Sequence, residues 1–198
     1  KQAHIVSQSL RKRRVGNSAA FGYLVNQFSC EGAMTELVQL AERLGLGLRA
    51  RGIMLVTAES CTGGWLAQII TAVPGSSKWF DRGFVTYSNA SKQEMLGVPA
   101  SILQEYGAVS EACVKAMAAG AIAHANSDLA VSISGIAGPG GATPDKPVGT
   151  VWVGWTWCSE KPQARVFHFE GDRQRVREQA VHAALDILLA EVERRQTS

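Results

Sequence analysis

A serine stands at the point where a short apolar stretch of the sequence gives way to a helical pattern. Residues 57–64 read Thr-Ala-Glu-Ser-Cys-Thr-Gly-Gly, which places Ser60 at a predicted strand-to-helix turn. A helix N-terminus presents free backbone N–H groups and the positive end of the helix dipole. This turn exposes the Ser60 side chain, and its N–H groups could hold an oxyanion or a phosphate. The pattern is equally typical of a structural N-cap at Ser60 or Thr62, with Gly63 and Gly64 easing the packing.

A lysine follows the end of the second predicted strand. Tyr87 ends that strand and Lys92 comes five residues later, close to the start of a predicted helix. A lysine that is desolvated beside a hydroxyl can lose its proton near neutral pH and act as a general base. A Ser/Lys pair needs no histidine, and the four histidines of this chain form no catalytic pattern. The alternative is an ordinary exposed lysine, which is the common state of this residue type.

A third junction is rich in glycine. Residues 132–141 read Ser-Ile-Ser-Gly-Ile-Ala-Gly-Pro-Gly-Gly, and four glycines in this stretch would let the backbone approach a ligand closely. The loop has neither the lysine of a Walker A motif nor the spacing of a dinucleotide-binding motif. Arg173, at the start of the last predicted helix, is well placed to bind a phosphate or a carboxylate.

Cysteine and histidine spacing argues against metal chemistry. The four cysteines form no CxxC pair and the histidines form no HxH or HExxH pattern, so we predict no metal site and no cofactor. Cysteines of this kind are typical of a reducing cytosol. Cys61, beside Ser60, remains a rival nucleophile, because a helix N-terminus can lower the pKa of a thiol.

The elements that must position these residues alternate between strand and helix. Strands are predicted at 53–58, 80–87, 129–134, 148–157 and 164–169, and helices at 62–72, 91–96, 101–106, 110–125 and 172–194. This order predicts a single-domain α/β fold, a three-layer α/β/α sandwich around a mixed, mostly parallel sheet. Such sheets bind ligands just beyond the carboxyl ends of their strands, where the three junctions should meet.

The N-terminal segment differs from the remainder. Residues 1–33 contain five Lys and Arg against one acidic residue, and they show no helical or strand period. Apolar residues at helical spacing begin after Met34, which would be the functional start, and they end near Gly52. We therefore predict a domain over 34–195 and an extension over 1–33 that lies outside the fold. The basic run 11–14 is typical of a solvated tail, although it could contact an acidic partner.

Charge and hydropathy restrict the partners of this chain. The net charge is +3, and the basic extension accounts for more than all of it, so the predicted domain is nearly neutral. A neutral domain argues against nucleic-acid binding. No apolar run is long enough to cross a membrane and no signal peptide is evident, which favours a cytoplasmic protein.

Five motifs in the same order together resemble the CinA C-terminal domain family. They are residues 58–64, 83–89, 107–110, 134–139 and 146–151. The resemblance implies an enzyme that hydrolyses the carboxamide of nicotinamide mononucleotide to nicotinate mononucleotide and ammonia, in pyridine-nucleotide (NAD) recycling. It implies a Ser/Lys mechanism with Ser60 as nucleophile, Lys92 as general base and Tyr87 ordering the proton network. Larger members carry a further N-terminal domain, for which residues 1–33 are too short.

The resemblance also implies a substrate-binding set and an assembly. The set comprises Glu59, Thr62, Gly63, Gly64, Asn89, Ser134, Gly135, Gly138 and Arg173, with Ser134 near the substrate and Arg173 holding charge on the nucleotide. The family resemblance favours a homo-oligomer, most simply a dimer. The main alternative is a non-catalytic nucleotide-binding regulatory module of the same fold, since fold does not guarantee activity. A nucleic-acid-associated competence or damage factor is a third reading, against which the neutral domain argues.

Overall fold

The computed structural model describes the backbone of residues 18–195 and the side chains from Gly32 onward. Contacts divide the chain between Thr35 and Glu36, and the fold below is that of the larger part, which begins at Glu36. Helix α1 covers Ser18–Ala50, so it begins earlier than the apolar period predicts. Periodicity detects a helix only where one face is apolar, which is the case from Leu37 onward. The basic run 11–14 lies outside the described residues.

A mixed sheet of five strands forms the centre of the fold, as the sequence predicts. The strands are β1 (Leu55–Glu59), β2 (Phe80–Val85), β3 (Leu129–Gly135), β4 (Thr150–Trp157) and β5 (Gln163–His168). Their order is β2-β1-β3-β4-β5, with β1 parallel to β2 and β3 and with β4 antiparallel to β3 and β5. β4 therefore runs against the other four strands. The apolar strands β1 and β3 are central because both of their faces are covered.

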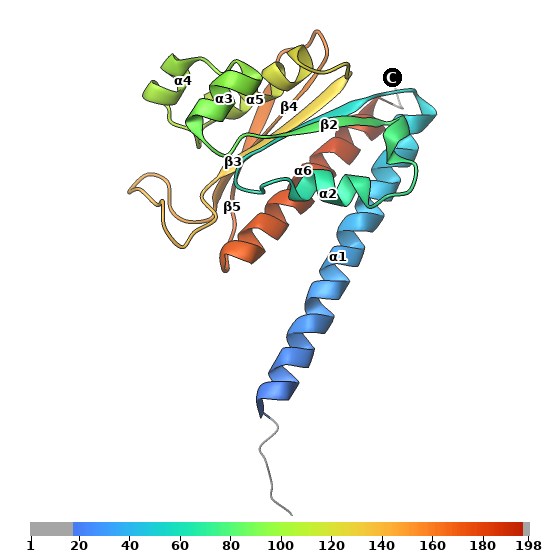
Figure 1. Ribbon diagram of the computed structural model, residues 1–198, viewed down its shortest axis with the longest axis vertical. Coiled ribbons are helices and arrows are strands. Elements are labelled where there is room, and N and C mark those ends of the chain that lie inside the picture. The colour runs from blue at the N-terminus through green and yellow to red at the C-terminus, as the bar shows by residue number, and fades with distance from the viewer. Residues whose placement is uncertain (1–17, 196–198) are drawn as a thin grey trace, which may run out of the picture. The chain divides into compact units, whose positions relative to one another are not determined.

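Helices cover both faces of this sheet (Figure 1). One layer contains α3 (Asn89–Leu96), α4 (Ala100–Glu105) and α5 (Glu111–Ala123). The opposite layer contains α2 (Trp65–Thr71), α6 (Arg173–Arg194) and the last turns of α1. Val56 and Ala58 of β1 pack against Met117 and Ala118 of α5 in the first layer. Leu37, Ala41, Leu44 and Leu48 are fully buried at helical spacing on α1, which explains why the sequence reveals this part of the helix.

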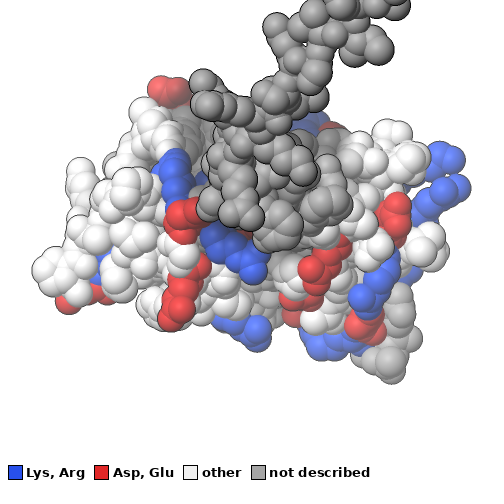
Figure 2. Space-filling view, turned by 90° about the horizontal axis from the view of Figure 1, so that it is seen from below, with Lys and Arg blue, Asp and Glu red and all other residues white. Residues whose placement is uncertain are grey.

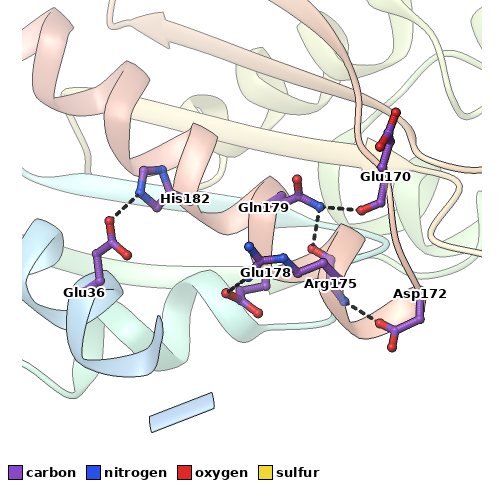
Figure 3. A network of polar contacts seen from close by, with 7 residues as sticks. All are labelled: Glu36, Glu170, Asp172, Arg175, Glu178, Gln179 and His182. Carbon is purple, nitrogen blue, oxygen red and sulfur yellow. Dashed lines mark hydrogen bonds and ion pairs between the residues drawn. The ribbon is translucent and has the colours of Figure 1, made fainter. Parts of the chain in front are cut away.

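Polar contacts fix the start of α6 and connect this helix to α1 (Figure 3). Asp172 caps α6, since its carboxylate accepts a hydrogen bond from the Arg175 N–H at 2.8 Å. About two turns beyond Arg175, His182 lies between Asp186, at 2.9 Å, and Glu36 of α1, at 3.4 Å. The start of α6 is thus held in place, which matters because its first two turns carry two arginines, Arg173 and Arg177, that reach the site described below.

The parallel strands bring the three predicted junctions together. β1, β2 and β3 run in the same direction, so their carboxyl ends at Glu59, Val85 and Gly135 lie along one edge of the sheet. The chain leaves this edge through the Ser60 turn, the Tyr87 loop and the glycine-rich loop. Open α/β sheets bind ligands at such an edge, and the site is found there.

The charge of the surface and the apolar character of the helices bear on which partners the protein could bind. Figure 2 shows Lys and Arg side chains interspersed with Asp and Glu on the face in view, rather than gathered into a patch of one sign. Among the described residues, no helix combines the length and apolar character needed to span a bilayer.

Candidate active site

The side chains of Ser60 and Lys92 meet in the interior of the protein. Lys92 Nζ lies 3.0 Å from Ser60 Oγ, and it also donates a hydrogen bond to the backbone carbonyl of Thr86 at 2.7 Å. Lys92 is 1% exposed and Ser60 is 8% exposed. The second reading of Lys92, as an ordinary exposed lysine, is therefore wrong. A buried amine in contact with a hydroxyl is the arrangement that a Ser/Lys pair requires.

The local structure explains how these two side chains come to face each other. Ser60 directly follows β1, and its N–H donates to the Ile133 carbonyl of β3 at 2.9 Å, which extends the sheet to the serine. On the other side, Ser88 caps α3 in a capping box with Ser91. This cap fixes the first turn of α3 and directs Lys92 toward the end of β1.

Burial makes the Lys92 amine easier to deprotonate. Loss of hydration lowers the pKa of the Lys92 amine below its ordinary value of 10.5, and the neighbouring thiols of Cys113 and Cys61 oppose this shift only in part. In the described residues no carboxylate forms a salt bridge with Lys92 that would stabilise the ammonium form. A lowered pKa provides the neutral amine that can accept the serine proton.

The same burial makes Cys61 a poor nucleophile. Desolvation raises the pKa of the Cys61 thiol to about 12, more than the nearby Arg177 and Lys92 lower it. Because only the thiolate is strongly nucleophilic, Cys61 stays unreactive at neutral pH. The structure thus favours Ser60 over its neighbour, a choice that the sequence left open.

A cavity of about 290 Å³ opens beside this pair. Its walls come from all three junctions and from the start of α6. The lining residues are Ser60, Cys61, Tyr87, Asn89, Lys92, Ala108, Val109, Ser134, Gly135, Ile136, Ala137, Gly138, Gly140, Gly141 and Arg173. Lys92 and Arg173 are the ionisable basic residues of this lining, and no Asp or Glu belongs to it. The guanidinium of Arg173 therefore favours a ligand with negative charge in this cavity.

Arg173 and Tyr87 form one wall of the mouth. Arg173 donates to the Gly138 carbonyl at 2.8 Å and to the Tyr87 hydroxyl at 2.9 Å. Tyr87 is 63% exposed and has no hydrogen bond to Ser60 or Lys92. The hydroxyl that was predicted to order the proton network of the pair is bonded to Arg173 instead, because the tyrosine points to the mouth. It is the backbone carbonyl of Thr86, one residue earlier, that contacts the lysine.

The glycine-rich junction provides the wall behind the pair. Ser134 is buried at the end of β3, and its hydroxyl donates to the Ala108 carbonyl at 2.8 Å. A Cβ at Gly135 would lie 2.6 Å from a methyl group of Val151. Gly138 has a φ of +82°, a backbone conformation that side chains disfavour. All three residues line the cavity, and the role of the glycine-rich loop in binding a ligand stays a prediction.

Four predicted substrate-binding residues lie outside the cavity lining. The Glu59 carboxylate turns away from the cavity and accepts hydrogen bonds from the N–H groups of Gly64, Leu66 and Ala67, at 2.9–3.1 Å. It therefore fills the N-terminus of α2, the place where a substrate phosphate was predicted. Thr62, Gly63 and Gly64 form the turn between Ser60 and this helix and do not line the cavity either.

One residue that no sequence motif singles out contacts the turn that follows Ser60. Arg177, one turn after Arg173 on α6, donates to the carbonyls of Cys61 and Thr62. The spacing of four between the two arginines was the available signal, since it places both on the same helix face. Among the described residues, no group of three or more His, Cys, Asp and Glu is arranged to hold a metal ion.

Comparison with known proteins identifies the family. The model of the CinA C-terminal domain matches residues 37–192. The chain belongs to the CinA C-terminal domain family. The family resemblance seen in the five motifs is thus confirmed, and the match begins close to the predicted domain boundary at Met34.

Relatives in this family carry names that describe an activity. The chain is 53% identical over 154 residues to the nicotinamide-nucleotide amidohydrolase PncC of Escherichia coli K12, covering 78% of this chain and 93% of that protein. It is 52% identical over 160 residues to PncC of Pseudomonas putida, covering 79% and 97%. A solved CinA superfamily protein from Klebsiella pneumoniae superposes with a TM-score of 0.77 at 39% identity, covering 80% of this chain and 98% of that one.

Proposed function

We propose that this protein is a metal-independent amidase that hydrolyses the carboxamide of nicotinamide mononucleotide to nicotinate mononucleotide and ammonia. The observation that carries the proposal is the contact of Lys92 Nζ with Ser60 Oγ, at 3.0 Å, on the wall of a cavity that favours anions. Its support from relatives is the identity of 52–53% to proteins named nicotinamide-nucleotide amidohydrolase.

The first half of the reaction forms an acyl-enzyme. Neutral Lys92 takes the proton of Ser60 while Ser60 Oγ attacks the carboxamide carbon. Cys61 lines the cavity, and its N–H is engaged by no backbone carbonyl of the described residues, so this N–H would bind the developing oxyanion. When the intermediate collapses, the C–N bond breaks and Lys92 returns its proton to the departing nitrogen, which leaves as ammonia. The nicotinoyl group of the nucleotide is then esterified to Ser60.

Water completes the cycle. Lys92, again neutral, takes a proton from a water molecule that attacks the ester carbon, and the bond to Ser60 Oγ breaks. Lys92 then gives its proton to Ser60, and the product leaves as nicotinate after its carboxyl group releases the second proton of the water to solvent. The proton transfers between Ser60 and Lys92 join atoms that lie 3.0 Å apart, and this route uses no metal-bound hydroxide.

The remainder of the cavity fits a nucleotide. Arg173 at the mouth would bind the phosphate, and its bond to Tyr87 keeps the guanidinium in place. Asn89, Ser134, Gly135 and Gly138 line the space between this arginine and the Ser/Lys pair, where the ribose and the pyridine ring would lie. We therefore retain these residues as substrate-binding and propose a structural role for Glu59, Thr62, Gly63 and Gly64.

The proposed reaction suits pyridine-nucleotide recycling in the cytoplasm, since it converts an amide nucleotide into its acid. We propose residues 34–195 as the catalytic domain and a homodimer as the assembly, with a small-molecule substrate and no nucleic-acid partner. The substrate, the domain and the homodimer follow from the family resemblance, and the lack of a nucleic-acid partner follows from the nearly neutral charge of the domain.

The decisive experiment measures ammonia and nicotinate mononucleotide formed from nicotinamide mononucleotide in the presence of EDTA. We expect turnover by the wild type, loss of turnover in Ser60→Ala, and retained turnover in the matched neighbour variant Cys61→Ala. Turnover by Ser60→Ala at the wild-type rate would refute the Ser/Lys mechanism. A wild-type protein that binds the nucleotide but releases no ammonia would instead support the non-catalytic binding module.

A further inference from the structure

Arg177 reaches from α6 to the turn that carries the proposed nucleophile. Its Nε donates to the Cys61 carbonyl at 3.1 Å and its Nη2 donates to the Thr62 carbonyl at 2.7 Å. The guanidinium also lies over the Trp65 ring, 5.2 Å from the ring centroid. One side chain thus contacts the turn at two successive carbonyls and the first residue of α2.

These contacts determine how the peptide planes of the turn are oriented. In a trans peptide the C=O and the following N–H point in opposite directions. Because both carbonyls converge on Arg177, the N–H groups of Thr62 and Gly63 point away from it. The Gly63 N–H accordingly donates to the Ser60 carbonyl at 3.0 Å. Arg177 therefore acts on the backbone conformation immediately after Ser60.

The turn has little else to hold this conformation. Gly63 and Gly64 have φ values of +63° and +94°, and glycine loses more conformational freedom than any other residue when it is ordered. Glu59 binds the far end of the turn, from Gly64 onward. Between Ser60 and Gly63, the side chain that reaches the backbone from outside the turn is that of Arg177.

We propose that Arg177 is a positioning residue, which fixes the turn so that Ser60 Oγ faces Lys92 Nζ. This inference rests on the proposed function, because it gives Ser60 the role of nucleophile. Arg177 does not line the cavity, whereas Arg173 does, so the two arginines on one face of α6 have separate tasks. Arg173 contacts the ligand space, and Arg177 acts through the backbone of residues 61 and 62.

The test compares Arg177→Met with Arg175→Met. Methionine keeps much of the aliphatic packing and removes the donors. Arg175 is a matched control on the same helix, because its guanidinium pairs with Glu178 on the surface and does not reach the site (Figure 3). Two readouts are measured: steady-state kcat and KM for nicotinamide mononucleotide, and the rate at which a fluorophosphonate labels Ser60, followed by intact mass.

We expect Arg177→Met to lower kcat and the labelling rate by about 100-fold with KM little changed, since a nucleophile misplaced by about 1 Å loses this much. Arg175→Met should match the wild type in both readouts. Added millimolar guanidinium should restore part of the rate in Arg177→Ala, which a merely structural role would not allow. Wild-type kcat and labelling in Arg177→Met would overturn the inference, as would a loss that follows the unfolding temperature and is not rescued.

The two readouts separate this inference from the proposed function. If the wild type is labelled at Ser60 but releases no ammonia, the proposed substrate is wrong, and slower labelling of Arg177→Met still supports the positioning role. If the wild type is not labelled, Ser60 is not an activated nucleophile and both proposals fail.

Discussion

Replacement of Lys92 by methionine tests the centre of the proposed mechanism. Methionine is close to lysine in shape and suits an apolar interior, so Lys92→Met removes the amine while it keeps most of the packing. The change deletes both hydrogen bonds of Nζ, to Ser60 Oγ and to the Thr86 carbonyl. Because these two partners have different roles, the variant should affect activity and stability to very different extents.

The loss of activity follows from the loss of the base. A positioned general base contributes about 10²- to 10⁴-fold in rate. At about 1.4 kcal/mol per factor of ten, this corresponds to about 3 to 5.5 kcal/mol of transition-state stabilisation. We expect kcat/KM to fall by this factor, because 8% exposure of Ser60 leaves little room for water to replace the amine. KM should change little, since substrate binding is assigned to other residues.

Stability should change much less, because two effects oppose each other. The Thr86 carbonyl loses its donor inside the protein, which costs about 1 to 3 kcal/mol. In return, methionine avoids the free-energy cost of burying the Lys92 amine. The lowered pKa of Lys92 is a sign of this cost.

The lowered pKa also predicts how stability depends on pH. Below the unfolded value of 10.5 and above the lowered folded value, the unfolded chain binds more protons at Lys92 than the folded one does. The contribution of Lys92 to the free energy of unfolding therefore increases with pH in this window, by at most about 1.4 kcal/mol per pH unit. Lys92→Met should lack this increase. Activity should rise with pH through the same lowered pKa, because the neutral amine is the active form.

The assay measures ammonia release and urea unfolding over a range of pH for the wild type, Lys92→Met and Lys161→Met. Lys161 is an exposed lysine in the β4–β5 connection, so its variant should behave like the wild type. Lys92→Met activity within a factor of about ten of the wild type would refute the role of Lys92, because that is less than a general base contributes.

Three further predictions concern Cys61, Arg173 and Glu59. Cys61→Ala should keep kcat/KM within about threefold, and iodoacetamide should not inactivate the wild type at pH 8, since a pKa of about 12 leaves on the order of one thiol in 10,000 ionised. Arg173→Met should raise KM by about 10- to 100-fold with little change in kcat, because a hydrogen bond to a charged group contributes about 1.5 to 3 kcal/mol. Glu59→Gln should lower the free energy of unfolding in urea by about 1 to 3 kcal/mol, because three N–H groups of α2 lose a carboxylate acceptor.

Each of these predictions has an outcome that would contradict it. Rapid loss of activity with iodoacetamide would mean that the Cys61 thiol ionises readily. A lower kcat with an unchanged KM in Arg173→Met would assign the arginine to the chemical step. If the Glu59→Gln protein has wild-type stability and an altered KM, Glu59 binds the substrate and does not act as a structural cap.

The alternation of strands and helices could be predicted from the sequence because it depends on local pattern. The strands β1 and β3 are continuously buried and mostly apolar, and α5 and α6 begin after the N-caps Ser110 and Asp172. The start of α1 could not be predicted, because residues 18–33 lack the apolar stripe on which the prediction depends.

Local pattern likewise identified Ser60 at a strand-to-helix turn and Lys92 near a helix start, but it left open whether they meet. Only the parallel pairing of β1 with β2 brings Lys92 within 3.0 Å of a serine 32 positions earlier. The same packing lowers the pKa of Lys92 and raises that of Cys61, because burial is a property of the assembled layers.

The tertiary structure also decided the roles of charged side chains for which the sequence shows only a position along the chain. Glu59 stands beside Ser60 in sequence, yet strand alternation turns it to the opposite face, where it caps α2. Arg177 lies 116 positions after Cys61 and still holds the turn that contains it. The sequence thus determined the fold class and the residue types of the site, because these depend on local period and motif. The pairing of those residues depends on contacts between distant segments, which arise only when the sheet and its helices assemble.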